Sequence, residues 1–361
     1  MKILVTGGAG FIGANFLNRF VPRHPEHTFV NVDALTYAAN LRSLEAIADR
    51  PNYGFERLDL VEAEAVRAAV ERHRPDAVVH FAAESHVDRS ISGPRPFLRT
   101  NIEGTFNLLE ACRAVWPAGA GIFHHVSTDE VYGSLGPEGK FREDTRYDPS
   151  SPYSASKAAS DHLVRAWGRT FGMTVKLTNC SNNYGPLQFP EKLIPLMILN
   201  LLERKPLPVY GKGENVRDWL FVDDHCAAIW TVLHHGAPGE TYNVGGNSEQ
   251  RNIDVVKLLC QVVAEETGAS AEELGRLITY VKDRPGHDLR YAIDAGRLER
   301  ELGWRPEETF ASGIRKTVKW YLANPGWVSD VRSGEYRRWI DSHYCGGLGG
   351  GLGGAPGGGA I

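Results

Sequence analysis

The sequence predicts an α/β fold in which a doubly wound parallel sheet is followed by a smaller C-terminal α/β lobe that would bind a substrate. Two observations lead to this prediction. Short apolar runs alternate with longer amphipathic stretches through the first half of the chain, which is typical of parallel strands joined by crossover helices. After about Asn179 this alternation ends and proline and glycine become frequent, which indicates a lobe of different construction.

The expected elements follow one another along the chain. Strands are expected at residues 3–6, 29–33, 53–58, 77–81, 121–127 and 174–178. Helices are expected at residues 12–21, 40–49, 62–72, 100–115 and 156–171, and at 253–266 in the second lobe. We expect one domain over residues 1–180, with a return to its sheet at 241–244, and a second over 181–345. Residues 346–361 are mostly glycine and are expected to be disordered.

Composition excludes several classes of protein. The chain of 361 residues carries a net charge of −4, which argues against a nucleic-acid partner. No apolar stretch approaches the length of a membrane span and the N-terminus lacks the pattern of a signal peptide, so we expect a cytoplasmic protein. Five scattered cysteines without a CxxC pair favour reduced thiols over disulfides, and no metal site is expected.

A glycine-rich loop directly follows the first expected strand. Gly8-x-Gly10-x-x-Gly13, preceded by Gly7, lies between that strand and a helix, which is the context of a Rossmann-type dinucleotide site. Phe11 and Ile12 belong to the same loop. The free N–H groups of the helix N-terminus would bind the pyrophosphate.

Two carboxylates end neighbouring strands of the same unit. Asp33 at the end of the second strand would bond the adenosine ribose and repel a 2′-phosphate, which favours NAD over NADP. Asp59 at the end of the third strand either meets the adenine or caps the next helix, and the sequence leaves both open.

Tyr153 and Lys157 are spaced to share one face of a helix, provided that the helix has begun by Tyr153. A tyrosine phenol has a pKa of about 10, and a neighbouring ammonium is expected to lower it. Such a pair can accept the proton of a hydroxyl group while hydride leaves the same carbon, and Lys157 can also bond the nicotinamide ribose.

The segment from Thr6 to Gly13 together with the Tyr153–Lys157 pair resembles the extended short-chain dehydrogenase/reductase superfamily, many of whose members act on nucleotide-sugars. The resemblance covers nearly all of the chain up to the glycine tail. It implies a tightly bound NAD that is regenerated in each turnover. It extends the expected cofactor site to Leu35, Thr36, Leu60, Phe81, Ala82, Ala83, Ser85, Thr100 and Asn183, although an N-cap role competes with cofactor contact at Thr100.

The paired carboxylates Asp129 and Glu130 follow the fifth expected strand, directly after Thr128. Hydride transfer alone does not need two further acid–base groups, whereas a dehydration needs a base for a carbon-bound proton and an acid for the departing hydroxyl. Two crowded carboxyl groups also tend to separate their pKa values. The resemblance implies that Glu130 is the base, that Asp129 is the acid, and that Thr128 bonds the reacting sugar hydroxyl.

The second half supplies the residues expected to bind the rest of a nucleotide-sugar. Lys192, the start of the following helix and Arg217 are suited to a diphosphate. By the resemblance, the nucleotide is dTDP, the substrate is dTDP-glucose, and Ser85 contacts both cofactor and sugar. The substrate site is then completed by Asn182, Leu193, Pro208, Tyr210, Asn252, Asp283, Arg284 and His287. Leu187-Gln188 departs from the family, which often has an aromatic residue and a histidine there.

Alternatives remain at this stage. The sequence distinguishes poorly between dTDP-glucose and a UDP-, GDP- or CDP-linked sugar as the substrate of this dehydration. A 4-epimerase or a decarboxylase of the same fold is disfavoured by Asp129 and Glu130, and a non-catalytic NAD-binding scaffold would be expected to lose catalytic residues that this chain keeps. The resemblance also implies a homodimer whose interface is formed by the helices expected at 100–115 and 156–171.

Overall fold

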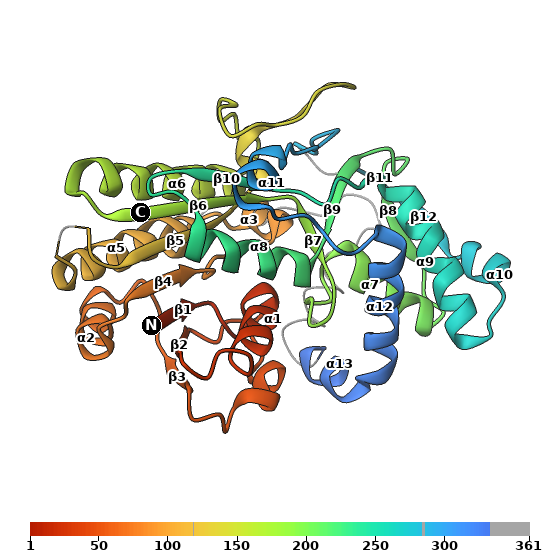
Figure 1. Ribbon diagram of the computed structural model, residues 1–361. Helices are drawn as coiled ribbons and strands as arrows, with labels where there is room; N and C mark the ends of the chain where they lie inside the picture. The colour runs from red at the N-terminus through yellow and green to blue at the C-terminus, as the bar shows by residue number, and fades with distance from the viewer. Residues whose placement is uncertain (118, 284–285, 333–361) are drawn as a thin grey trace, which may run out of the picture.

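The computed structural model describes residues 1–117, 119–283 and 286–332 (Figure 1). The expected disordered tail at 346–361 and the expected substrate residue Arg284 lie outside these residues.

A seven-stranded parallel sheet forms the larger part of the structure, with strand order β10-β6-β5-β4-β1-β2-β3. Its strands are β1 (Lys2–Thr6), β2 (Thr28–Asp33), β3 (Tyr53–Arg57), β4 (Ala77–His80), β5 (Ile122–Thr128), β6 (Thr174–Cys180) and β10 (Thr241–Val244). The order reverses between β1 and β4, and in such sheets ligands bind beyond the carboxyl ends of the strands at this point. The predicted fold class is confirmed.

Helices cover both faces of the sheet (Figure 1). On one face, α1 (Phe11–Phe20) and α8 (Val222–His235) bury Phe16, Leu17 and Ile229 against β1 and β4. On the other face, α2 (Ala63–His73), α5 (Gly104–Val115) and α6 (Pro152–Phe171) pack Leu109 and Val164 against β4 and β5. This double coverage explains why the strands are almost continuously apolar in sequence.

Three expected helices differ from the structure. Residues 40–49 contain a 3₁₀-helix, η1 (Leu41–Ile47), whose first turn is capped by the Asn40 side chain. The helix expected from residue 100 is preceded by α3 (Val87–Ser92), α4 (Arg95–Phe97) and a π-helical segment, η2 (Leu98–Glu103), which continues into α5. Helix α6 begins earlier than expected because Ser151 and Ser154 form a capping box ahead of Pro152. Tyr153 therefore already lies in the helix.

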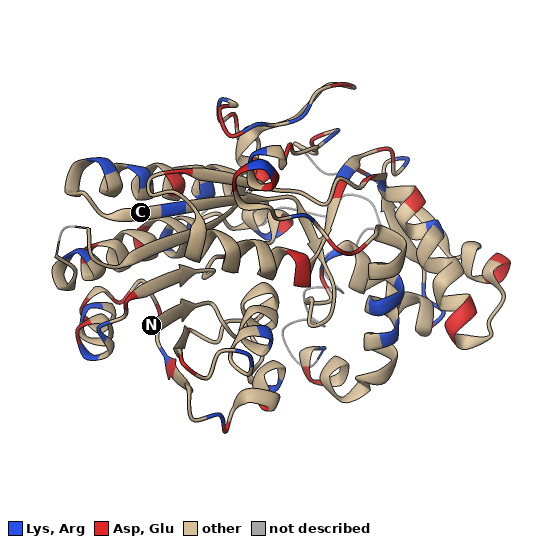
Figure 2. Cartoon of the chain, viewed as in Figure 1, with Lys and Arg blue, Asp and Glu red and all other residues tan. Residues whose placement is uncertain are grey.

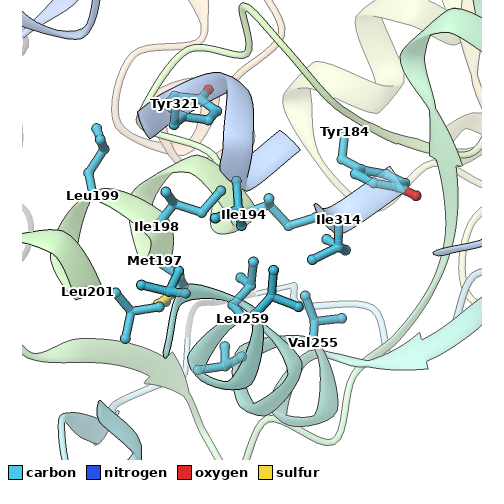
Figure 3. Packing of buried hydrophobic residues seen from close by; sticks show 14 of the residues in the cluster. Tyr184, Ile194, Met197, Ile198, Leu199, Leu201, Val255, Leu259, Ile314 and Tyr321 are labelled. Carbon is cyan, nitrogen blue, oxygen red and sulfur yellow. The ribbon is translucent and has the colours of Figure 1, made fainter. Parts of the chain in front are cut away.

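The rest of the chain forms two small sheets with their own helices. One sheet has the order β11 (Glu249–Arg251), β9 (Val216–Phe221) and β7 (Asn182–Tyr184), and the other pairs β12 (Ile278–Val281) with β8 (Leu207–Tyr210). The helices are α7 (Leu193–Leu202), α9 (Asn252–Thr267), α10 (Ala271–Gly275), α11 (Gly296–Leu302), α12 (Phe310–Ala323) and α13 (Pro325–Val331). Figure 3 shows their core, in which α7, α9 and α12 meet through Ile198, Leu259 and Ile314.

The chain crosses between these parts more than once. β10 pairs with β6 as expected at residues 241–244, and α8 also returns to the large sheet. The domain boundary at residue 180 stays a prediction. Within the described ranges, no helix combines the length and the apolar character required to cross a bilayer. Figure 2 shows lysine and arginine interspersed with aspartate and glutamate along the helices of both parts.

Candidate active site

A cavity of about 360 Å³ lies at the carboxyl ends of the parallel strands. It joins the glycine loop after β1, the ends of β2, β4, β5 and β6, the start of α6, and the segment that leads into α7. The residues predicted from sequence that line it are Gly7, Gly10, Phe11, Ile12, Gly13, Asp33, Thr36, Asp59, Leu60, Phe81, Ala82, Ala83, Ser85, Thr100, Thr128, Asp129, Glu130, Tyr153, Lys157, Asn182, Asn183, Lys192 and Leu193.

The glycine loop leaves no room for side chains at two positions. Gly7 has φ +73° and a Cβ there would lie 2.6 Å from the backbone N of Ala82. A Cβ on Gly13 would lie 2.4 Å from the carbonyl oxygen of Gly7. The loop can therefore approach a ligand with bare backbone, and α1 begins beside it with no side-chain cap on its first N–H groups. These features fit the pyrophosphate of NAD.

A Gly13→Ala substitution is expected to weaken NAD binding by at least about tenfold, which corresponds to about 1.4 kcal/mol, because the loop must move to admit the methyl group. Titration of cofactor-free protein with NAD measures this. Gly54→Ala is the matched control, since a Cβ at Gly54 meets nothing within 4 Å. Equal affinity in the Gly13 variant would contradict the assigned role of the loop.

Asp33 is held in a fixed orientation at the end of β2. Its carboxylate accepts hydrogen bonds from Ala9 N at 2.9 Å and from Leu35 N at 2.8 Å. Burial raises the pKa of this carboxyl group, while the two N–H donors oppose that change. Leu35 itself, predicted as a cofactor residue, is not part of the cavity lining, because its side chain packs against the core beside α1.

Two residues with competing interpretations line the cavity. Asp59 accepts a hydrogen bond from Val61 N at 3.1 Å, but the N-cap residue of α2 is Glu62. Thr100 lies inside the π-helical segment η2 and not at a helix start, so it is not an N-cap. The capping alternative is therefore wrong for both residues, and their contact with a cofactor stays a prediction.

Tyr153 and Lys157 lie one turn apart in α6, and both side chains are buried. Lys157 Nζ donates to Val126 O at 3.0 Å, and burial lowers the pKa of this ammonium group to about 8. Tyr153 and Thr128 share a hydrogen bond. Burial, followed by the charge of Glu130, raises the pKa of Tyr153 well above its ordinary value. The expected lowering of this pKa is wrong for the protein alone, because desolvation of the phenolate and the negative charge of Glu130 both raise it.

Asp129 and Glu130 follow β5 in a short 3₁₀-helix, η3 (Asp129–Tyr132). Asp129 is 1% exposed, and burial together with the charges of Glu130 and Asp218 raises its pKa well above the ordinary range. Its Oδ1 lies 3.4 Å from the Thr128 hydroxyl, and its Oδ2 has no hydrogen-bond partner among the described residues. Glu130 is only half-buried. The pair thus combines a buried carboxyl group whose raised pKa favours the protonated form with a carboxyl group closer to solvent.

Lys192 and Asn182 bring the second part of the chain to the same cavity. Lys192 is the N-cap residue of α7, and its Nζ donates to Ser85 O at 2.8 Å. The first turn of α7 has no side-chain cap, so its N–H groups can receive an anion. Asn182 Oδ1 is buried without a hydrogen-bond partner in the described part of the chain, which suits a site that receives a polar ligand.

The remaining predicted substrate residues lie outside the cavity lining: Pro208, Tyr210, Arg217, Asn252, Asp283 and His287. Tyr210 OH donates to Asp88 at 3.3 Å, and His287 Nδ1 lies 2.6 Å from Asp283. Arg217 is 5% exposed, donates to Asp288 O at 2.9 Å and lies 4.2 Å over the Tyr291 ring. These contacts hold the residues to neighbouring loops, and their part in binding substrate stays a prediction.

Several lining residues were not predicted. Six are direct neighbours of predicted positions at or just after strand ends, where the pattern could have included them, namely Val32, Ala34, Leu58, Glu84, Ser127 and Ser181, and Val126 and Cys180 lie two residues before predicted positions. Glu191 and Ile194 flank the predicted Lys192 and Leu193. Ala38, Ala39, Gln188, Phe189 and Trp219 reach the cavity from loops and from other elements, and no local pattern marks them.

Two other features lie away from this cavity. A second cavity of about 880 Å³ opens beside α6 and α11 and is lined by arginines, among them Arg165, Arg169 and Arg300, and by acidic residues. It contains none of the groups at the carboxyl ends of the strands. His24, Glu26 and His27 place possible metal-ligand atoms within 4.8 Å of one another on a surface turn, where His24 and Glu26 already contact each other at 2.9 Å.

Comparison with known proteins adds independent observations. Residues 4–317 match the family model described as GDP-mannose 4,6 dehydratase. The dTDP-glucose 4,6-dehydratase of Shigella flexneri is 56% identical, with 96% of this chain and 99% of that protein covered. The dTDP-glucose 4,6-dehydratase of Streptomyces venezuelae, solved with NAD and dTDP bound, is 45% identical with a TM-score of 0.84, covering 92% and 100% of the two chains.

A structure with a different activity also resembles this one. The UDP-glucose 4-epimerase of Thermus thermophilus, solved in complex with NAD, is 30% identical with a TM-score of 0.79, covering 89% of this chain and 99% of that one. The fold is therefore common to epimerases and dehydratases, and the residues of the cavity must distinguish the two reactions.

Proposed function

The chain belongs to the family described as GDP-mannose 4,6 dehydratase, and we propose that it is a hydro-lyase that converts dTDP-glucose to dTDP-4-keto-6-deoxyglucose with NAD. The observation that carries this proposal is the position of Asp129 and Glu130. A buried carboxyl group with a raised pKa and a half-buried one line the same cavity as the Tyr153–Lys157 pair. The reaction of a 4-epimerase contains no step that requires these two acid–base groups.

The cofactor site is formed by the glycine loop, Asp33 and Lys157. The bare backbone at Gly7 and Gly13 would accommodate the pyrophosphate, and the oriented carboxylate of Asp33 would bond the adenosine ribose. Lys157 would hold the nicotinamide ribose. When bound, NAD supplies the hydride acceptor and later the hydride donor, and its positively charged ring favours the phenolate form of Tyr153.

Oxidation at C4 of the sugar comes first. Tyr153 accepts the proton of the C4 hydroxyl as hydride leaves C4, and Thr128, which bonds Tyr153, orients that hydroxyl. The resulting 4-ketone acidifies the proton on C5. This oxidation uses the Tyr–Lys pair that is shared with other members of the superfamily, so it does not by itself distinguish a dehydratase from an epimerase.

Elimination of water follows at C5 and C6. Glu130 removes the C5 proton, and Asp129 donates a proton to the departing C6 hydroxyl. Burial and the negative charge of Glu130 raise the pKa of Asp129 and so favour its protonated form, which is the state that an acid requires. Hydride then returns to C6 and a proton returns to C5, so the reaction has no net redox change.

Proton balance gives Thr128 a second role. In each turnover Tyr153 gains the C4 hydroxyl proton and Asp129 loses one to the leaving water, so Tyr153 must lose a proton and Asp129 must gain one before the next turnover. Thr128 bonds Tyr153, and its hydroxyl lies 3.4 Å from Asp129 Oδ1. The threonine hydroxyl therefore offers a direct path between the two groups.

The diphosphate and nucleotide are held by the second part of the chain. Lys192 and the N-terminus of α7 supply positive charge beside Ser85. Asn182, which lines the cavity, would bind the sugar. The diphosphate and nucleotide side would be completed by Arg217, Tyr210, Asn252, Pro208, Asp283, Arg284 and His287. The same dehydration on a UDP-, GDP- or CDP-linked glucose is the alternative, because none of these residues that the structure describes lines the cavity.

The substrate is tested by incubating the protein with glucose linked to each of dTDP, UDP, GDP and CDP, without added NAD. We expect dTDP-glucose to give the highest kcat/KM, and a 4-keto-6-deoxy product that absorbs in alkali. A higher kcat/KM with another nucleotide would overturn the assignment of dTDP and leave the dehydration standing. Turnover of none of the four would overturn the dehydration itself.

We also propose a homodimer, supported by apolar side chains that remain exposed on the helices expected to form the interface. Phe106 in α5 and Phe171 in α6 are 42% and 41% exposed, and Leu98, just before the first of these expected helices, is 49% exposed. Light scattering at micromolar concentration is expected to give the mass of two chains, and Phe106→Glu the mass of one. A monomeric mass for the unmodified protein would refute the dimer.

The four described cysteines, Cys112, Cys180, Cys226 and Cys260, are free and buried. Buried thiols without disulfides are typical of proteins in reducing compartments. This supports our proposal that the enzyme works in the cytoplasm.

A further inference from the structure

A fully buried histidine and carboxylate lie behind Lys157, and the proposed chemistry does not use them. His125 is on β5 and Asp161 is on α6, and both side chains are 0% exposed. His125 Nε2 lies 3.3 Å from Lys157 Nζ and 3.2 Å from Asp161 Oδ1. One ring nitrogen therefore faces the lysine that serves the active site on one side and a buried carboxylate on the other.

The helix brings these groups together by its periodicity. Tyr153, Lys157 and Asp161 follow one another at intervals of four residues on the buried face of α6. His125 points toward this face from β5, whereas His124 before it points to the opposite face of the sheet, where its Nε2 lies 3.2 Å from Thr178 Oγ1. Asp161 is thus the third member of a stripe that begins with Tyr153.

Charge explains why Lys157 needs this arrangement. Burial of an ammonium group disfavours its charged form, and the pKa of Lys157 falls accordingly. The charge of Asp161 opposes that fall. Asp161 remains ionised despite its own burial, because His125 and Lys157 lower its pKa and Tyr147 OH donates to its Oδ2 at 2.8 Å.

The imidazole couples the two charges. In one tautomer Nε2 donates to Asp161, and in the other it accepts from Lys157, so the ring can adjust to the protonation of the lysine. Burial lowers the pKa of His125 to about 4, so it is neutral at neutral pH.

Other ionisable groups around His125 do not replace Asp161. His80 on β4 lies 5.2 Å away between ring centroids, and burial lowers its pKa, so it is neutral. Arg165 on α6 is positive and donates to Tyr147 OH at 2.8 Å. Asp161 and then Cys180 raise the pKa of Lys157, but burial raises the pKa of the Cys180 thiol, so the negative charge that acts on Lys157 is that of Asp161.

We propose that His125 and Asp161 are positioning residues that keep Lys157 protonated and directed toward the cofactor, and thereby set the pH range in which Tyr153 can act. This inference rests on the role given above to Tyr153 and Lys157. The Tyr–Lys pair thereby becomes part of a group of four buried side chains, Tyr153, Lys157, His125 and Asp161. This group extends from the cavity along the buried face of α6 as far as Asp161.

Removal of the Asp161 charge should move both limbs of the pH profile. Lys157 would lose its proton at a lower pH, so the alkaline limb of the profile moves to lower pH. A less protonated Lys157 stabilises the Tyr153 phenolate less, so the acid limb moves to higher pH. The bell-shaped profile should therefore become narrower from both sides. On either flank, kcat/KM should fall by about tenfold for every tenfold change in the ionisation constant of the group that sets that limb.

The experiment measures kcat/KM for dTDP-glucose across pH, NAD affinity and thermal unfolding for Asp161→Asn, His125→Leu and His125→Gln. Asp161→Asn and His125→Leu should narrow the profile and weaken NAD binding, because Lys157 is no longer held toward the ribose. His125→Gln should largely restore both, since an amide can also donate to Asp161 and accept from Lys157. His124→Gln is the matched control, equally buried on the opposite face of the sheet.

A purely structural role would lower the unfolding temperature and the amplitude of activity while leaving the width of the profile unchanged. That result in both His125→Leu and Asp161→Asn would overturn the inference. If Asp161→Asn does not fold, the comparison of His125→Leu with His125→Gln decides alone, and equal profiles would overturn it. If the unmodified protein does not turn over dTDP-glucose, the proposed function fails, and unchanged NAD affinity in the variants would separately overturn this inference.

Discussion

Tyr153→Phe is expected to lower kcat by roughly 10²- to 10⁴-fold and to prevent even transient reduction of bound NAD. The phenol is the group that accepts the C4 hydroxyl proton, and without it hydride transfer from C4 has no base. The ring remains, so its packing against Phe97 at 6.3 Å between centroids is preserved. Single-turnover absorbance of the nicotinamide after mixing with dTDP-glucose measures the first half of the reaction directly.

Tyr132→Phe is the matched control for this variant. Tyr132 is equally buried, and its hydroxyl lies 2.9 Å from Asn243 Oδ1, away from the cavity lining. It is expected to lose stability and to keep its rate of cofactor reduction. If Tyr153→Phe reduced NAD at the rate of the unmodified protein, Tyr153 would not be the base.

Glu130→Gln is expected to separate the two halves of the reaction. The variant should still oxidise C4, so reduced nicotinamide accumulates, but C5 keeps its proton and kcat for dehydration falls by roughly 10²- to 10⁴-fold. The amide also removes the charge that raises the pKa of Asp129, so the neighbouring acid is more readily ionised and elimination is weakened further. Product formation and nicotinamide absorbance are followed in the same sample.

Glu143→Gln controls for loss of a half-buried carboxylate. Glu143 accepts a hydrogen bond from Asn243 N at 3.0 Å and lines the second cavity, so its loss should leave dehydration intact. Asp129→Asn tests the acid instead of the base. This variant should still exchange the C5 proton with solvent but should no longer eliminate water. Normal dehydration by Glu130→Gln would show that the role given to Glu130 is wrong.

The fold could be predicted from the sequence to the level of its strands and their alternation with helices. Buried parallel strands are continuously apolar and therefore easy to recognise. The helix boundaries could not be predicted as well. The early start of α6 depends on the Ser151–Ser154 capping box, and the π-helical segment around Thr100 depends on tertiary packing, where Asn101 Nδ2 donates to Ser156 Oγ at 2.8 Å.

The candidate site was predicted best where it follows strand ends. Residues such as Asp33, Thr128 and Asp129 converge because parallel strands finish at one edge. Tyr210 ends β8, Arg217 lies in β9 and His287 follows β12, so all three belong to the second part of the chain, whose position depends on long-range packing. They lie beside Asp88, Tyr291 and Asp283, outside the cavity lining.

Burial explains the part of the electrostatics that the sequence could not reveal. Spacing places Lys157 near Tyr153, but it does not show that desolvation dominates the pKa of both groups. Nor does it show that a buried carboxylate, Asp161, offsets the desolvation of Lys157. Both effects require the full set of neighbours that only the folded chain provides.

The central claim is that hydride taken from C4 returns to C6 within one turnover as water is lost. It is tested most directly with dTDP-glucose that carries deuterium at C4, incubated without added NAD in ordinary water, with the product examined by NMR and mass spectrometry. We expect a 4-keto-6-deoxy product that carries the label at C6. In deuterated water, unlabelled substrate should give a product with a solvent deuteron at C5. Label that remained at C4 of a sugar retaining its C6 hydroxyl, as in an epimerase reaction, would contradict it.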